Sequence, residues 1–261
     1  MNEQSVLYGI GLGPGAADLI TLRAMKILQE EVDVIVAPRT EKNNSSLVLN
    51  ILKKAQSQLQ MQSKVRALEV EILELVFPMK EQQHELLNQA WDDAFEKIKS
   101  RLDNGLNVAF ITEGDPSIYS TFSYILDRVK KRMPNQRVEI VPAVTSFLAA
   151  SAILNQTLIE GEERLCVLPA HYGVEVLPSL LENFDTIVLT KVFKVLGELC
   201  ASLEKQKMLD KAVYVLKATM DGEKICRDLR ELNFEEEKKN YFSMVIIFVR
   251  KRKGILSGER E

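Results

Sequence analysis

Few cysteines and histidines are present in this sequence, and their scarcity limits the chemistry open to it. Cys166, Cys200 and Cys226 are odd in number and far apart, which fits neither a disulfide framework nor the ligand spacing of a zinc site. His84 and His171 are the only imidazoles, and they form no paired ligand pattern. We therefore expect core thiols and no metal ion held by the protein itself.

A long apolar segment and an excess of positive charge are also missing. The longest apolar run, around residues 244–249, is too short to cross a bilayer, and the N-terminus has no basic segment followed by an apolar one. With 34 basic and 37 acidic residues, the net charge of -3 argues against nucleic-acid binding, which depends on many cationic contacts. We expect a cytoplasmic protein that binds neither membranes nor nucleic acid.

Short runs rich in valine and isoleucine alternate with longer stretches of helical period. This alternation predicts an α/β protein with a mainly parallel sheet covered by helices. We expect two α/β domains, 1–145 and 146–261. The expected strands are 6–11, 33–37, 70–77, 107–111 and 138–141 in the first half, and 165–168, 186–189, 212–216 and 242–250 in the second.

Two helices are expected in the first half, over 21–30 and 81–102. Thr21 can cap the first of them, because its hydroxyl oxygen can accept a hydrogen bond from a free backbone N–H of the first turn. Leu22, Met25 and Leu28 are expected to share one face of that helix.

Residues 9–15 read GIGLGPG, four glycines in seven positions directly behind an apolar stretch. From Gly11 onward the segment matches the dinucleotide-binding pattern G-x-G-x-x-A, with Asp33 at about the distance of a ribose-binding acid. Three features weaken the match. Pro14 removes an N–H, the helical period begins only near Thr21, and Asp33 stands before the apolar part of its strand instead of at the strand's end. A tight turn that needs only glycine dihedrals is another interpretation.

Two more loops follow expected strands. Residues 112–121 contain a Gly-Asp-Pro turn, and residues 141–146 read VPAVTS. The carboxyl ends of strands are where α/β sheets bind ligands. A single Gly-Asp-Pro is more commonly a turn whose aspartate bonds its own backbone, here Asp115. Three such loops in one chain indicate a ligand site.

Together these segments resemble the tetrapyrrole methylase family, the S-adenosylmethionine-dependent enzymes of corrin and sirohaem synthesis, over nearly the entire chain. YGIGLGPGAADLITLRAMKIL is similar to the family's first strand, loop and helix, EGDPSIYST to its Gly-Asp-Pro loop, and VPAVTS to its third loop. Ala143 stands where the family usually has glycine. The segments APR (37–39), FPM (77–79), YST (119–121) and VLPA (167–170), with Trp91, are similar to the precorrin-2 and cobalt-factor-2 C20-methyltransferase branch.

The resemblance implies two α/β domains that hold S-adenosylmethionine in a cleft, and methyl transfer to C20 of precorrin-2 or cobalt-factor-2 in cobalamin synthesis by a homodimer. By position, the implied cofactor contacts are Pro14, Glu113, Gly114, Asp115, Ile118, Thr145, Ser146, Lys191 and Ala218. Candidates for a catalytic base are Tyr119, His171 and Asp115. Candidates for binding the tetrapyrrole's carboxylates are Arg39, Lys80 and Arg164.

Other functions stay open at this point. A tetrapyrrole methylase acting at another ring carbon would share the same loops. A nucleotide-dependent oxidoreductase would use the G-x-G-x-x-A match. A tetrapyrrole-binding protein without catalysis would show damage to the cofactor loops, where only Ala143 departs from the family's pattern.

Overall fold

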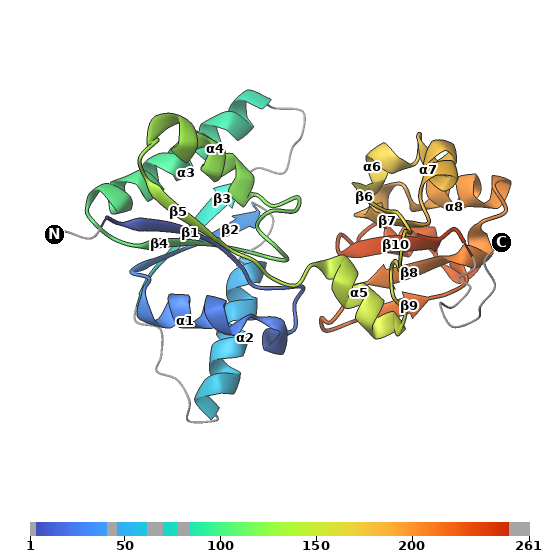
Figure 1. Ribbon diagram of the computed structural model, residues 1–261, viewed down its shortest axis with the longest axis horizontal. Coiled ribbons are helices and arrows are strands. Elements are labelled where there is room, and N and C mark those ends of the chain that lie inside the picture. Colours follow the sequence, from blue (N-terminus) through green and yellow to red (C-terminus); the bar gives the residue numbers. More distant parts are fainter. Residues whose placement is uncertain (1–3, 41–45, 62–69, 78–83, 251–261) are drawn as a thin grey trace. The chain divides into compact units, whose positions relative to one another are not determined.

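The computed structural model describes residues 4–40, 46–61, 70–77 and 84–250 (Figure 1). The chain divides into two compact units, Met1–Ser146 and Phe147–Glu261, which we call unit 1 and unit 2. Each unit has one five-stranded sheet with helices packed against it, which confirms the predicted α/β class.

Unit 1 is built on a parallel sheet in the order β3-β2-β4-β1-β5. Helices α3 and α4 lie on one face of this sheet and α1 and α2 on the other (Figure 1). Because every described strand runs the same way, all their carboxyl ends lie at one edge, which we call the carboxyl edge. The elements are β1 Val6–Gly11, α1 Leu22–Glu30, β2 Val34–Thr40, α2 Leu47–Met61, β3 Glu71–Phe77, α3 His84–Asp103, β4 Val108–Thr112, α4 Phe122–Arg132 and β5 Arg137–Val141.

Helix α1 begins where the sequence predicts, because the Thr21 hydroxyl accepts a hydrogen bond from the N–H of Ala24 at 3.2 Å. Met25 and Leu28 are buried, but Leu22 is 90% exposed, so the expected shared face is wrong for Leu22. A step of three residues falls about 60° short of a full turn, so Leu22 and Leu28 lie about 120° apart around the helix.

Unit 2 has a mixed sheet in the order β6-β7-β10-β8-β9. Among the described strands of unit 2, only β6 and β7 pair in parallel, whereas β10 is antiparallel to both β7 and β8, and β9 is antiparallel to β8. The expectation of a mainly parallel sheet is therefore confirmed for unit 1 and wrong for unit 2. The strands are β6 Leu165–Pro169, β7 Thr186–Thr190, β8 Ala212–Leu216, β9 Lys224–Cys226 and β10 Ser243–Phe248, and the helices are α5 Ser146–Leu154, α6 Ala170–Gly173, α7 Leu177–Asn183, α8 Leu196–Lys205 and α9 Phe234–Glu237.

The nine predicted strands are all present, with ends that differ by at most three residues. They are recognisable because most are apolar runs buried on both faces, as all six residues of β1 are. Strand β9 was not predicted, since its three residues are too short for a readable alternation. Four 3-10 helices complete the described part: η1 Ala17–Leu19, η2 Val192–Lys194, η3 Leu209–Lys211 and η4 Leu229–Glu231.

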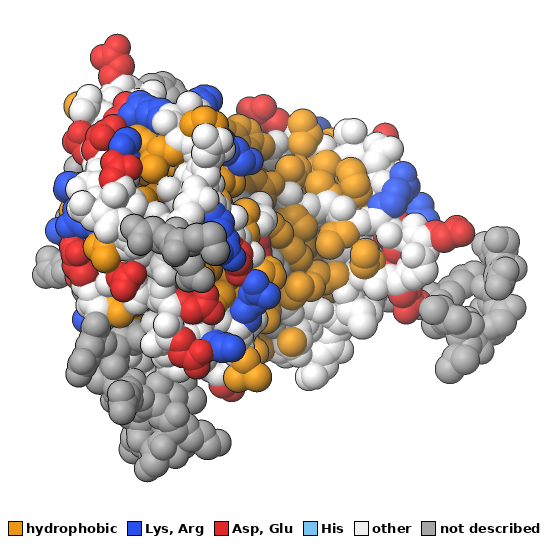
Figure 2. Space-filling view, turned by 60° about the vertical axis from the view of Figure 1, so that its left-hand side comes forward, with side chains coloured by type: hydrophobic (Ala, Val, Ile, Leu, Met, Phe, Trp, Pro, Cys, Tyr) orange, Lys and Arg blue, Asp and Glu red, His pale blue; other side chains and the backbone are white. Residues whose placement is uncertain are grey.

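Acidic and basic side chains are interspersed on the face of the molecule shown in Figure 2. Of the helices in the described residues, none combines the length and the apolar character that a membrane span requires.

A buried hydrogen-bond network fixes the segment that leads into β10. Glu237 is 3% exposed, and its carboxylate accepts hydrogen bonds from the Tyr214 hydroxyl, from Lys224 Nζ at 2.8 Å and from Asn240 Nδ2 at 2.6 Å. Burial alone raises the pKa of Glu237, but the hydrogen bonds from these three donors outweigh it and lower that pKa below its ordinary value of 4.5. The ionised carboxylate therefore stabilises unit 2.

The lowered pKa of Glu237 predicts an acid-sensitive contribution to stability. Because the folded-state pKa lies below the unfolded one, this contribution is present above about pH 4.5 and is lost as the pH falls through the folded-state pKa. We expect Glu237→Gln to lower the free energy of unfolding by about 1–3 kcal/mol at pH 7. The difference from the wild type should shrink toward pH 4.

Urea unfolding followed by circular dichroism at both pH values measures this effect. The matched control is Glu235→Gln, since Glu235 lies in the same helix but pairs with Lys238 on the surface and should change stability little. An equal loss in both variants would assign the effect to surface charge.

Candidate active site

Three loops meet at the carboxyl edge of unit 1, because they follow the neighbouring strands β4, β1 and β5. The main chains of the first two loops pair directly. Gly114 N donates to Gly13 O at 2.8 Å, and Leu12 N donates to Thr112 O at 2.9 Å. Gly13 and Gly114 have φ angles of +77° and +64°, in the left-handed region that favours glycine.

Gly11 lies where all three loops come together. A Cβ atom at Gly11 would lie 2.5 Å from the Gly114 carbonyl oxygen, 2.6 Å from the Ala143 Cβ and 2.9 Å from the Pro116 Cδ. The loops can approach this closely only because Gly11 has no side chain. The methyl group of Ala143, at the family's usual glycine position, faces this junction and is accommodated there.

Asp115 joins the second loop to the third. One carboxylate oxygen accepts a hydrogen bond from Ala143 N and the other from Ser117 N, both at 2.8 Å, and the residue is 9% exposed. Charge-assisted hydrogen bonds of this kind are stronger than neutral ones. The placement of Asp115 therefore favours a role in holding the loops over the role of a catalytic base.

The geometry opposes a dinucleotide site at the glycines. Helix α1 begins only at Leu22, after the separate helix η1, so its N-terminus does not start within the glycine motif. Asp33 lies at the amino edge of the sheet, where its carboxylate accepts the N–H of Asn107 at 2.8 Å. A ribose-binding acid would stand at the opposite end of that strand.

The carboxyl edge also presents groups that suit a ligand. Thr145 is 7% exposed, and its hydroxyl oxygen has no hydrogen-bond partner among the described residues. A Cβ atom at Gly114 would meet no atom within 4 Å, so open space lies beside this backbone. A buried hydroxyl without a partner is costly unless a ligand or water satisfies it.

The other predicted residues of unit 1 lie in the same loops or close to them. Ile118 and Tyr119 are exposed after β4, and Tyr119 has a φ of +48°. Arg39 is half-buried in the last part of β2, the strand beside β4. Pro14 is buried, whereas Glu113 and Ser146 are partly exposed. Lys80 lies outside the described residues.

Lys191 and Ala218, the predicted cofactor residues of unit 2, are brought to one end of its sheet. Lys191 N donates to Ser243 O at 2.7 Å, and Lys217 N donates to Phe242 O at 2.8 Å, so the loops after β7 and β8 both contact the start of β10. The φ angles of Lys191, Lys217 and Thr219 are +56°, +49° and +64°. Such strained non-glycine residues cluster at functional sites.

Two further predicted residues of unit 2 lie at opposite ends of its sheet. His171 is exposed in α6, directly after the carboxyl end of β6, and its ring lies 3.8 Å from that of Tyr172. Arg164 precedes β6, and its backbone N–H donates to Asp185 at 2.8 Å before the start of β7. The structure therefore does not bring Arg164 to the end that holds Lys191 and Ala218, and its placement favours a structural role.

Sequence reasoning missed the strained backbone of Lys217 and Thr219 and the contacts of Phe242 and Ser243. Neither lysine nor threonine marks a left-handed position in a sequence, in the way that glycine does. The local pattern therefore carried no signal for the left-handed conformations of Lys217 and Thr219.

The described residues offer no activated thiol and no metal cluster. Burial raises the pKa of Cys200 to about 11 and also raises the pKa values of Cys166 and Cys226. None of the three is therefore a thiolate nucleophile at neutral pH. Within the same residues, no group of three or more histidine, cysteine, aspartate or glutamate side chains could hold a metal ion.

The sequence of this chain is similar to those of one known family and of two named relatives. The model of the family Tetrapyrrole (Corrin/Porphyrin) Methylases matches residues 6–233. A probable cobalt-precorrin-2 C(20)-methyltransferase from Methanocaldococcus jannaschii is 36% identical over 92% of this chain and 95% of its own. The cobalt-precorrin-2 C(20)-methyltransferase from Salmonella typhimurium is 32% identical over the same shares of the two chains.

Solved structures share the fold. A cobalamin biosynthetic enzyme, cobalt precorrin-4 methyltransferase, superposes with a TM-score of 0.70 at 20% identity, over 96% of this chain and 98% of its own. A uroporphyrin-III C-methyltransferase from Thermus thermophilus, solved in complex with S-adenosyl homocysteine, gives a TM-score of 0.60 at 19% identity, over 94% and 98% of the two chains.

The bonds of Asp115 predict that its removal destabilises unit 1. In Asp115→Asn one of the two backbone N–H donors faces an amide NH₂ group in place of an oxygen. We expect the free energy of unfolding to fall by about 1–3 kcal/mol, measured by urea unfolding. Asp127→Asn, at an exposed aspartate of α4, is the control and should change stability little. Lost turnover with unchanged stability and unchanged affinity for S-adenosyl homocysteine would instead identify Asp115 as a base.

Proposed function

Because the chain belongs to the tetrapyrrole (corrin/porphyrin) methylase family, we propose that it is an S-adenosylmethionine-dependent C-methyltransferase that methylates C20 of precorrin-2 or cobalt-factor-2 in cobalamin biosynthesis. One observation carries this proposal. Relatives named for C20 methylation of cobalt-precorrin-2 align with nearly the whole chain, at identities that exceed 30%.

The three loops of unit 1 fit S-adenosylmethionine. The unpartnered Thr145 hydroxyl and the open space beside Gly114 supply a hydrogen-bonding group and room for a ligand. The proposed contacts from unit 1 are Pro14, Glu113, Gly114, Asp115, Ile118, Thr145 and Ser146. From unit 2 we propose Lys191 and Ala218, which its strained loops present at one end of the sheet.

The residues of this chain mainly bind, orient and exclude water. When bound, S-adenosylmethionine supplies an activated methyl group on a sulfonium, so no reactive side chain is needed to create the electrophile. The paired backbones around Gly11 fix the loops before any ligand arrives, so less conformational freedom remains to be lost on binding. Positioning is then the chain's main contribution to rate.

A base is needed because the methylated ring carbon must lose a proton. Both carboxylate oxygens of Asp115 already accept backbone hydrogen bonds, which leaves Tyr119 and His171 as our candidates. Tyr119 is 55% exposed and directly follows the second loop, so we place it first. For the acceptor's carboxylates we propose Arg39 and Lys80, whereas the position of Arg164 beside Asp185, before β6, favours a structural role for Arg164.

We also propose a cytoplasmic homodimer. The three cysteines are free thiols, as expected in a reducing compartment. Sedimentation velocity measures the assembly directly, and the expected mass is twice the 29.6 kDa of one chain.

The position of the new methyl group tests the proposed function. Precorrin-2 and cobalt-factor-2 are each incubated with the protein and S-adenosylmethionine carrying a ¹³C-labelled methyl group, and the product is located by NMR. We expect the label at C20. Label at another ring carbon would show a different methylase of the same family, and binding of a nicotinamide dinucleotide without S-adenosylmethionine in calorimetry would favour an oxidoreductase.

The unpartnered Thr145 hydroxyl predicts that its removal weakens ligand binding without lowering the stability of the protein. In Thr145→Val no intramolecular hydrogen bond is lost, so the free energy of unfolding should stay unchanged or rise. The dissociation constant of S-adenosyl homocysteine, measured by calorimetry, should rise about tenfold for the loss of one hydrogen bond.

Thr186→Val is the matched control with the opposite pattern. Its hydroxyl donates to Leu158 O at 2.6 Å within unit 2, so this variant should lose stability and keep its affinity for the cofactor product. Unchanged affinity in Thr145→Val would remove Thr145 from the proposed contacts.

A further inference from the structure

Three aromatic rings from three elements form a continuous stack in unit 1. The rings of Phe77 and Trp91 have centroids 3.8 Å apart with planes inclined by 20°, and the rings of Trp91 and Tyr124 have centroids 4.8 Å apart with planes inclined by 29°. We call these three residues the aromatic column. It joins β3, α3 and α4.

The column becomes exposed near the carboxyl edge, the same edge as the three loops. Phe77 ends β3, and Tyr124 lies in the first turn of α4, the helix that follows the second loop. Phe77 and Trp91 are 6% and 5% exposed, whereas Tyr124 is 51% exposed. Ile118 and Tyr119, a few residues before Tyr124, are exposed as well, so apolar surface gathers along this segment.

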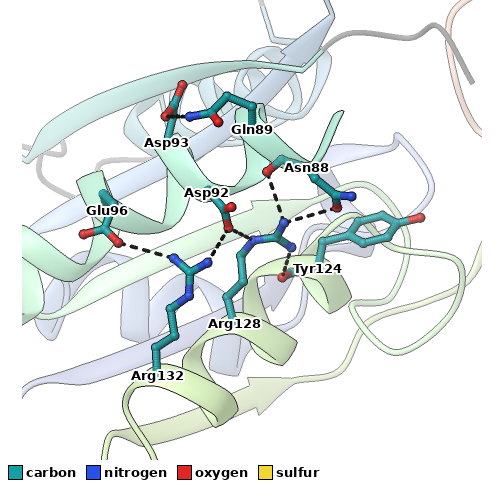
Figure 3. A network of polar contacts seen from close by, with 8 residues as sticks. All are labelled: Asn88, Gln89, Asp92, Asp93, Glu96, Tyr124, Arg128 and Arg132. Carbon is teal, nitrogen blue, oxygen red and sulfur yellow. Dashed lines mark hydrogen bonds and ion pairs between the residues drawn. The ribbon is translucent and has the colours of Figure 1, made fainter. Parts of the chain in front are cut away.

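A polar network ties the start of α4, at the Tyr124 backbone, to α3 (Figure 3). From α4, the Arg128 guanidinium donates to Asp92 Oδ1 at 2.7 Å, to the Asn88 carbonyl oxygen at 3.2 Å and to the Tyr124 carbonyl oxygen at 3.1 Å. Arg132 adds a second bond to Asp92 Oδ1, at 2.8 Å. The hydrogen bond from Arg128, with its charge, lowers the pKa of Asp92 and keeps this carboxylate ionised.

This network fixes the first turn of α4 on α3. The Tyr124 backbone cannot shift along α3 without breaking the bonds of Arg128 to both helices. An exposed aromatic ring that is held in place loses little conformational entropy when a flat ligand stacks on it. The core does not require that exposure, since Phe77 and Trp91 already fill the buried part of the column.

We propose that the exposed face of Tyr124 is the stacking surface for the macrocycle of the methyl acceptor, which makes Tyr124 a binding and specificity residue. This inference rests on the proposed function, because that function supplies a flat conjugated ligand at this edge of the sheet. Stacking suits such a ring, and Ile118 and Tyr119, also exposed in the segment before α4, offer further hydrophobic surface.

Trp91 gives the test a direct reporter, because it is the only tryptophan in the chain and stacks on Tyr124. Binding of cobalt-factor-2, a strongly absorbing ring, should quench its emission, and free tryptophan corrects for absorbance by the ligand. Titration of the full-length protein then gives a dissociation constant that does not depend on turnover.

The decisive comparison is between Tyr124→Ala, Tyr124→Phe and the wild type. We expect Tyr124→Ala to raise both the dissociation constant and the KM for cobalt-factor-2 about tenfold, and Tyr124→Phe to keep wild-type values because it retains the ring. Affinity for S-adenosyl homocysteine should stay the same in both. Tyr124→Leu repeats the test with a bulkier replacement in case Tyr124→Ala folds poorly.

The matched control is Ile72→Ala, an exposed apolar side chain in the amino half of β3, which should change neither constant. Unchanged values in Tyr124→Ala or Tyr124→Leu, beside normal methylation by the wild type, would overturn the inference and leave the proposed function intact. If the wild type methylates no tetrapyrrole, the proposed function fails. The fluorescence titration then still decides whether Tyr124 binds such a ring.

Discussion

The close approach of three main chains around Gly11 is the constraint on which the candidate site depends. No side chain fits at this position, because a Cβ there would clash with the Gly114 carbonyl oxygen and the Ala143 methyl group, both closer than van der Waals contact allows. Asp115 then holds the second and third loops together through two backbone N–H groups. The parallel sheet makes this junction possible, since it brings the ends of β4, β1 and β5 side by side. A candidate site made in this way consists mostly of backbone.

Unit 2 also holds its loops in fixed conformations, but these loops do not depend on glycine. Its loops carry lysine and threonine in left-handed conformations, which cost free energy that surrounding contacts must offset. The hydrogen bonds of Lys191 and Lys217 to the start of β10 hold these loops, and the buried carboxylate of Glu237 anchors the segment just before that strand. Rigidity in both units fits methyl transfer, in which alignment and exclusion of water matter more than a reactive side chain.

The aromatic column adds a surface of another kind to the carboxyl edge of unit 1. Backbone groups in the loops suit a small polar ligand, whereas the exposed Tyr124 ring suits a wide flat one. Both features depend on hydrogen-bonded supports. Asp115 supports the loops, and Arg128 with Asp92 supports Tyr124 on α3. These three charged residues thus act on the geometry of the site.

The sequence by itself determined the α/β class, nine strands, the Thr21 cap and the three loops, because hydrophobic period and turn chemistry are local properties. Only the tertiary structure decided the antiparallel course of β10, the exposure of Leu22 and the distance of Arg164 from Lys191 and Ala218. It also decided that Asp115 is occupied by backbone donors and that Phe77, Trp91 and Tyr124 form one stack. The physical reason is that strand direction, hydrogen-bond partners and ring contacts depend on residues far apart in the chain, and no local pattern records those distances.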